Sequence, residues 1–79
     1  MTREVMEICK NLRESDLPLM LRAIEAGKRC GEFWVSEVFH AHERGRVIEA
    51  MRISGRFELV TRREALASGR PRMVAVWRG

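Results

Sequence analysis

The sequence has no long apolar run, and cysteine and proline each occur only twice in its 79 residues. A membrane-spanning helix needs about 20 consecutive apolar residues, so we expect no membrane span. Residues 1–4 lead into mixed charged sequence instead of an apolar segment, which predicts that no signal peptide is present. Nothing marks the chain as secreted, so we expect Cys9 and Cys30 to stay reduced in a cytoplasmic, prokaryotic protein.

The sequence also lacks the residue groupings that catalysis and metal binding need. Its acidic residues are scattered, whereas acid–base catalysis needs paired, partly buried carboxylates or a nucleophile beside a base. His40 and His42 are two residues apart, and on a helix such side chains diverge by about 200°, which is poor for shared metal ligation. We therefore expect a protein that is not an enzyme, binds no metal and uses no cofactor.

Positive charge is abundant and unevenly placed along the chain. Residues 1–39 carry six basic and seven acidic groups, whereas residues 40–79 carry nine basic and four acidic groups. All nine of those basic residues are arginine. A basic half beside a nearly neutral half is typical of a protein that binds a polyanion. An arginine-rich proteome would explain the choice of arginine over lysine, but not its position in one half.

The chain length predicts one domain covering residues 1–79, because so short a chain cannot fill two cores. Apolar residues at helical spacing, with capping residues before them and glycines after them, predict four helices. Gly27 is expected to end the second helix. A turn is expected at Gly45, since a glycine within a helix costs about 1 kcal/mol. The predicted helices cover residues 3–14, 16–27, 36–42 and 46–54.

Short runs of β-branched and aromatic residues predict three strands. The first is the brief run Phe33–Val35, and the other two cover residues 57–61 and 73–77. A turn-rich, basic connection over residues 62–72 joins the last two strands into a hairpin. Helices followed by a small antiparallel sheet indicate an α+β fold.

The element order from Leu17 to Trp77 resembles the winged helix-turn-helix family of DNA-binding domains. The resemblance is carried by residues 34–38 entering the first helix of the motif, by the glycines at 45 and 55 that bound the second, and by the basic wing tip at residues 69–72. It implies a winged-helix core over residues 16–79, with three helices and a hairpin wing. Residues 1–15 form an additional N-terminal helix extension.

The resemblance implies that the chain binds double-stranded DNA, as a small transcriptional regulator whose second motif helix enters the major groove. Arg46, Glu49 and Arg52 would then face base edges. Residues 42–44, including Arg44, would lie near the helix start and the phosphates. The wing would place four further arginines along the backbone or in the minor groove: Arg62, Arg63, Arg70 and Arg72.

Several alternatives remain open at the level of sequence. Another register takes 3–14 and 16–27 as the first two helices and 36–54 as the third. The arginines could contact only phosphates, as in a non-specific chromatin-like protein, or the domain could be a protein–protein module in a larger complex. The N-terminal helix could form a homodimer that reads a pseudo-palindromic site. Trp34 and Trp77 are expected to join the sheet to the helices, and neither a membrane nor a small-molecule substrate is an expected partner.

Overall fold

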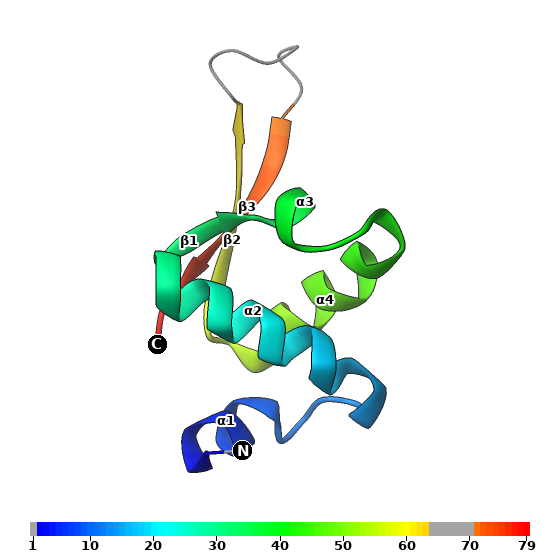
Figure 1. The fold of residues 1–79 in the computed structure, drawn as a ribbon, viewed down its shortest axis with the longest axis vertical. Coiled ribbons are helices and arrows are strands. Elements are labelled where there is room, and N and C mark those ends of the chain that lie inside the picture. The colour runs from blue at the N-terminus through cyan, green and yellow to red at the C-terminus, as the bar shows by residue number, and fades with distance from the viewer. Residues whose placement is uncertain (1, 64–70) are drawn as a thin grey trace.

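The computed structural model describes residues 2–63 and 71–79, which form an α+β arrangement of helices against a small antiparallel sheet (Figure 1). These residues contain four α-helices, one 3-10 helix and three strands. In chain order the elements are α1 (Arg3–Cys9), η1 (Glu14–Asp16), α2 (Leu17–Cys30), β1 (Glu32–Trp34), α3 (Val35–Val38), α4 (Ala41–Ser54), β2 (Phe57–Arg63) and β3 (Pro71–Trp77). None of the described helices is both long and apolar enough to cross a bilayer.

β3 is the central strand of the sheet, with β1 on one side and β2 on the other, and both pairs are antiparallel. Ala75 of β3 lies opposite Phe33 of β1 and Leu59 of β2. Residues opposite one another share a face, and neighbours along a strand alternate between faces. The sheet therefore has an inner face, which carries these three residues, and an outer face, which carries Trp34 and Val74. The inner face packs on the helices, because Phe33 and Ala75 belong to the buried core.

The core between the inner face and the helices is built around aromatic contacts. The ring of Phe57 meets that of Phe33 edge-on, with 6.2 Å between centroids, and lies 5.0 Å from that of Trp77. Trp77 thus joins the sheet to the helices as expected. Trp34 lies on the outer face, outside the core cluster, and it is the residue directly before α3. The helix α2 contributes buried residues at helical spacing: Leu19, Met20, Ala23, Ile24, Ala26 and Gly27.

The helix α2 continues past Gly27 to Cys30, so the prediction that Gly27 ends it is wrong. The helix stops at Gly31, whose φ of 78° lies in the region that favours glycine. Gly27 is instead a contact point, because a Cβ atom at this position would lie 2.9 Å from the Cβ atom of Trp77. The missing side chain therefore lets α2 approach the end of β3 closely.

The helix α1 is shorter than predicted, since it ends at Cys9 and not at residue 14. Thr2 caps it by accepting a hydrogen bond from the N–H of Val5. The N–H of Leu12 then donates to the carbonyl of Cys9, so the chain makes a tight turn where a longer helix would continue. This turn packs Leu12 against the core and leads into η1. Burial raises the pKa of the Cys9 thiol.

The turn between α3 and α4 lies at Phe39 and His40, and the prediction of a turn at Gly45 is wrong. The helix α4 runs unbroken through Gly45, and neither predicted division of residues 36–54 matches it. A mid-helix glycine costs about 1 kcal/mol, which tertiary packing of the helix offsets. The α4 side chains that supply this packing are Val47, Ala50 and Met51.

The strands β2 and β3 extend two residues further than predicted at the ends that face the connection between them. Arg62 and Arg63 therefore end β2, and Arg72 is the second residue of β3. Arginines that were expected in a loop thus belong to strands, where each side chain is assigned to one face of the sheet. Arg70, the remaining expected wing residue, lies outside the described residues.

Candidate nucleic-acid interface

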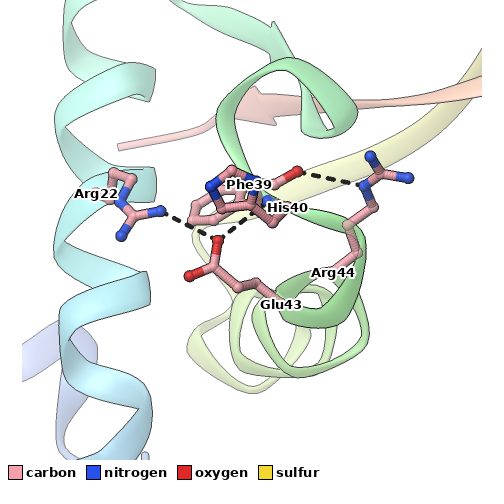
Figure 2. Close-up of polar contacts among 5 residues, drawn as sticks. All are labelled: Arg22, Phe39, His40, Glu43 and Arg44. Carbon is pink, nitrogen blue, oxygen red and sulfur yellow. Dashed lines mark hydrogen bonds and ion pairs between the residues drawn. The ribbon is translucent and has the colours of Figure 1, made fainter.

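A network of polar contacts fixes the corner between α3 and α4 (Figure 2). The Oε1 atom of Glu43 accepts a hydrogen bond from the backbone N–H of His40 at 3.0 Å and another from Nη1 of Arg22 at 3.3 Å. The bond from His40, together with the positive charge of Arg22, lowers the pKa of Glu43 although partial burial opposes this. Glu43 therefore caps the start of α4 and ties it to α2, instead of lying free near a phosphate.

Phe39 is held at the same corner by two arginines. The guanidinium of Arg22 lies over its ring, 5.4 Å from the centroid, and Nε of Arg44 donates a hydrogen bond to its carbonyl at 3.3 Å. In Figure 2, Arg22 and Arg44 approach the corner from opposite sides. These contacts set the direction in which α4 leaves the turn, and they place Arg44 at the beginning of that helix.

One stripe of α4 faces the β2–β3 side of the molecule. Arg44, Ile48 and Arg52 are spaced four residues apart, so each lies only about 40° around the helix from the next. Arg44 and Ile48 line a groove of ≈ 210 Å³ between α4, α3 and β3, which we call the β3 groove. Its other lining residues are Val35, Ser36, Pro71, Arg72 and Met73. The β3 groove thus has apolar walls and two arginines.

Arg72 crosses from β3 to α3 and holds these two elements together. Its Nε and Nη2 atoms donate to Oγ of Ser36 at 3.2 and 2.7 Å, and its guanidinium lies 4.5 Å from the ring centroid of Trp34. Glu37 adds an ion pair at 3.6 Å. With a side chain only 26% exposed, Arg72 positions the strand against the helix, in addition to lining the β3 groove.

Arg62 and Arg63 are neighbours in β2 but lie on opposite faces of the sheet. Arg63 is opposite Pro71 and therefore on the inner face, which packs on α2 and α4. It is exposed and has no ion pair in the described part of the chain. Arg62 lies on the outer face and pairs with Glu32 of β1. Because Glu32 holds Arg62, Arg63 is the one of these two neighbours that is available to a ligand.

Arg46 does not share a face with Arg52, so the expected trio of base-reading residues is divided. The two positions lie about 120° apart around α4. Arg46 bonds instead to η1, with Nη2 at 2.7 Å from the carbonyl of Ser15 and Nε at 3.0 Å from Oδ1 of Asp16. Glu49 is exposed between the two arginines. The expected grouping of Arg46 with Arg52, and of Arg62 with Arg63, is therefore wrong.

The two histidines are closer than their predicted helical positions allow. Their rings stack with 5.7 Å between centroids and 4° between planes, because His40 is the extended residue before α4 and not part of a helix. In this stack the rings lie face to face and do not converge on a shared point. Among the described residues, no group of three or more histidine, cysteine, aspartate or glutamate side chains is arranged to hold a metal ion.

Sequence reasoning named Arg72 as a wing residue, but it did not identify the contacts that organise this surface. Arg22 and Glu43 meet across 21 positions, and Arg72 and Ser36 across 36 positions. No local pattern of residues indicates such distant partners. Ile48 lines the β3 groove because β3 lies beside α4, and its position in the sequence does not indicate this contact.

Comparison with protein-family models, with curated proteins and with solved structures finds no match to this chain. The assignment of a function therefore depends on the geometry of the residues themselves. The surface they form combines a helix stripe, a groove with two arginines and an exposed arginine on the adjoining strand.

Proposed function

We propose that this chain is a winged helix-turn-helix domain that binds double-stranded DNA, with α3 and α4 as the motif and the β2–β3 pair as the wing. The order of the elements and the turn before α4 support this assignment. The major groove of DNA, about 12 Å wide, accepts one α-helix. In this arrangement α4 enters the groove, and the wing contacts the neighbouring backbone.

The observation that carries the proposal is the stripe of α4 beside the β3 groove. Arg52 presents a guanidinium that can bind the O6 and N7 atoms of guanine, and Ile48 presents an apolar surface that suits a thymine methyl group. Arg44 begins this stripe at the helix start, and Arg63 lies on the wing strand beside it, at positions where phosphates would lie. The roles expected for Arg46 and Arg62 are not part of the proposal, because Asp16 and Glu32 hold these residues.

A second candidate function is that of a protein-binding module, and one observation favours it. Acidic residues pair with four arginines of the basic half: Arg46, Arg62, Arg72 and Arg78. This reduces the free positive charge that would attract DNA. Such a module would show no duplex binding even at low salt.

The test compares two adjacent arginines in titrations of a labelled duplex at several salt concentrations. Arg63→Ala is expected to weaken binding roughly threefold to tenfold and to lower the slope of log K against log salt by about 0.9, because one phosphate contact is lost. Arg62→Ala removes the same charge from the outer face and is expected to bind like the parent. A parent protein that does not bind duplex at low salt, or two variants that lose equal affinity, would contradict the proposal.

A selection from random oligonucleotides then distinguishes a regulator from a non-specific DNA-binding protein. Arg52→Ala is expected to relax preference at one base pair if the protein reads sequence. If it contacts only phosphates, the selection is expected to yield no consensus.

A further inference from the structure

A second pocket lies on the other side of α4, opposite the β3 groove. It has a volume of ≈ 410 Å³ and is bounded on one side by Gly45, Arg46, Glu49 and the apolar Ile53 of α4. On the other side it is bounded by η1 and by Asn11 and Arg13 of the segment that leads into η1. We call it the η1 pocket. In Figure 1, α4 lies between the β2–β3 pair at one end of the molecule and α1 at the other.

The η1 pocket and the β3 groove open on different sides of the same helix. Glu49 lies about 100° and Arg46 about 160° around α4 from Ile48, the residue that lines the β3 groove. Arg52 is exposed and lies on the strip of α4 between the two, whereas Gly45 lines the η1 pocket. A ligand that covers this strip can therefore reach both hollows at once.

The charges of the η1 pocket leave one cation available. Arg46 is paired with Asp16 at 2.9 Å, so these two residues neutralise each other. Arg13 is exposed and has no ion pair within the part of the chain that the structure describes. Its backbone is nevertheless fixed, because its carbonyl accepts the first hydrogen bond of η1, from the N–H of Asp16 at 2.9 Å. Glu49 is the opposing charge, and it lies on the α4 side of the pocket.

We infer that the η1 pocket is a second backbone-binding site, in which Arg13 takes a phosphate of the DNA strand opposite to the one that the wing contacts. This inference depends on the proposed function. A helix in the major groove has a phosphate backbone on each side, because its diameter of about 10–12 Å nearly fills the groove. The amide of Asn11 is a neutral donor beside the same phosphate. The phosphate lies on the η1 side, away from the carboxylate of Glu49.

The inference gives the N-terminal extension a direct part in binding. The turn after α1 and the cap of η1 deliver Arg13 to the flank of α4. The wing and the N-terminal extension then contact the two DNA strands from opposite sides, and these contacts fix the depth and tilt of α4 in the major groove. Arg46 contributes by bonding to Asp16 and so holding η1 against α4, and not by reading a base.

The experiment measures duplex binding of the full chain at several salt concentrations for Arg13→Ala, with Arg29→Ala as the matched control. Both residues are exposed arginines, and Arg29 lies about 20 Å from η1 at the far end of α2. Arg13→Ala is expected to bind roughly threefold to tenfold more weakly and to lower the salt slope by about 0.9. Arg29→Ala is expected to keep the parental affinity and slope. Far-UV circular dichroism and thermal midpoints verify that both variants remain folded.

The outcomes separate this inference from the proposed function. If the parent does not bind duplex, the proposed function fails. If the parent binds and Arg63→Ala weakens binding, but Arg13→Ala behaves like Arg29→Ala, the second site alone is overturned. Glu49→Gln adds an independent measurement, because removing the carboxylate is expected to strengthen phosphate binding in the η1 pocket without any change at the wing.

Discussion

On the inner face of the sheet the ring of Phe57 lies 5.0 Å from that of Trp77, and on the outer face the ring of Trp34 lies 4.5 Å from the guanidinium of Arg72. The first contact belongs to the core and joins the sheet to the helices, whereas the second is partly exposed and joins β3 to α3. The same strands therefore stabilise the domain through one face and position charged groups through the other. The behaviour of an arginine in this sheet depends on its face more than on its neighbours in sequence.

The largest expected difference between the faces is in stability. Phe57→Ala is expected to lower the free energy of unfolding by about 3–5 kcal/mol, because it removes a large side chain from the core. Trp34→Ala is expected to cost about 1–2 kcal/mol, since that ring is half-buried and its main loss is the contact with Arg72. Urea denaturation followed by circular dichroism measures both. Equal losses for the two variants would show that the outer face is as important to stability as the core.

A smaller effect is expected at Arg72. Arg72→Ala is expected to destabilise the domain by about 1–2 kcal/mol, because it removes a cation–π contact and hydrogen bonds to Ser36. Arg72→Lys keeps the charge but loses the planar group that spans Trp34 and Ser36, so we expect nearly the same loss of stability. Thermal and urea midpoints check this. A lysine variant as stable as the parent would mean that only the charge at this position matters.

The smallest effect is expected for the ion pair between Arg62 and Glu32. Both side chains are about half exposed, at 49% and 47%, so solvent screens their attraction. A double-mutant cycle with Arg62→Ala and Glu32→Ala is expected to give a coupling energy of about 0.2–1 kcal/mol. The coupling is expected to fall further when salt is raised. A coupling energy of several kcal/mol would place this pair among the main supports of the sheet.

The helices and strands could be predicted because they depend on local patterns. Apolar spacing identifies α2, and alternating β-formers identify β2 and β3. The boundaries were less accurate where packing outweighs local preference. Gly45 lies inside α4 because burial of residues such as Met51 offsets its helix cost, and Gly27 lies inside α2 because Trp77 needs the space.

The candidate site could be predicted only in outline. The excess of arginine in residues 40–79 indicates a basic surface, but it does not distinguish the arginines that acidic residues hold from those that are free. Asp16 pairs with Arg46, and Glu32 pairs with Arg62, although the two members of each pair are 30 positions apart in the sequence. Such pairings follow from tertiary structure, and no periodicity in the sequence reports them. The stripe formed by Arg44, Ile48 and Arg52 becomes evident only once α4 is known to be continuous.

The central position of β3 has a consequence for the synthesis of this protein. Residues 71–77 supply the partner for both β1 and β2, and Trp77 also fills the space left by Gly27 on α2. A nascent chain that still holds these residues within the ribosomal exit tunnel has neither of its strand pairs. We therefore expect the sheet to assemble only after residue 77 has emerged. Until then the helices lack the strand that completes their packing.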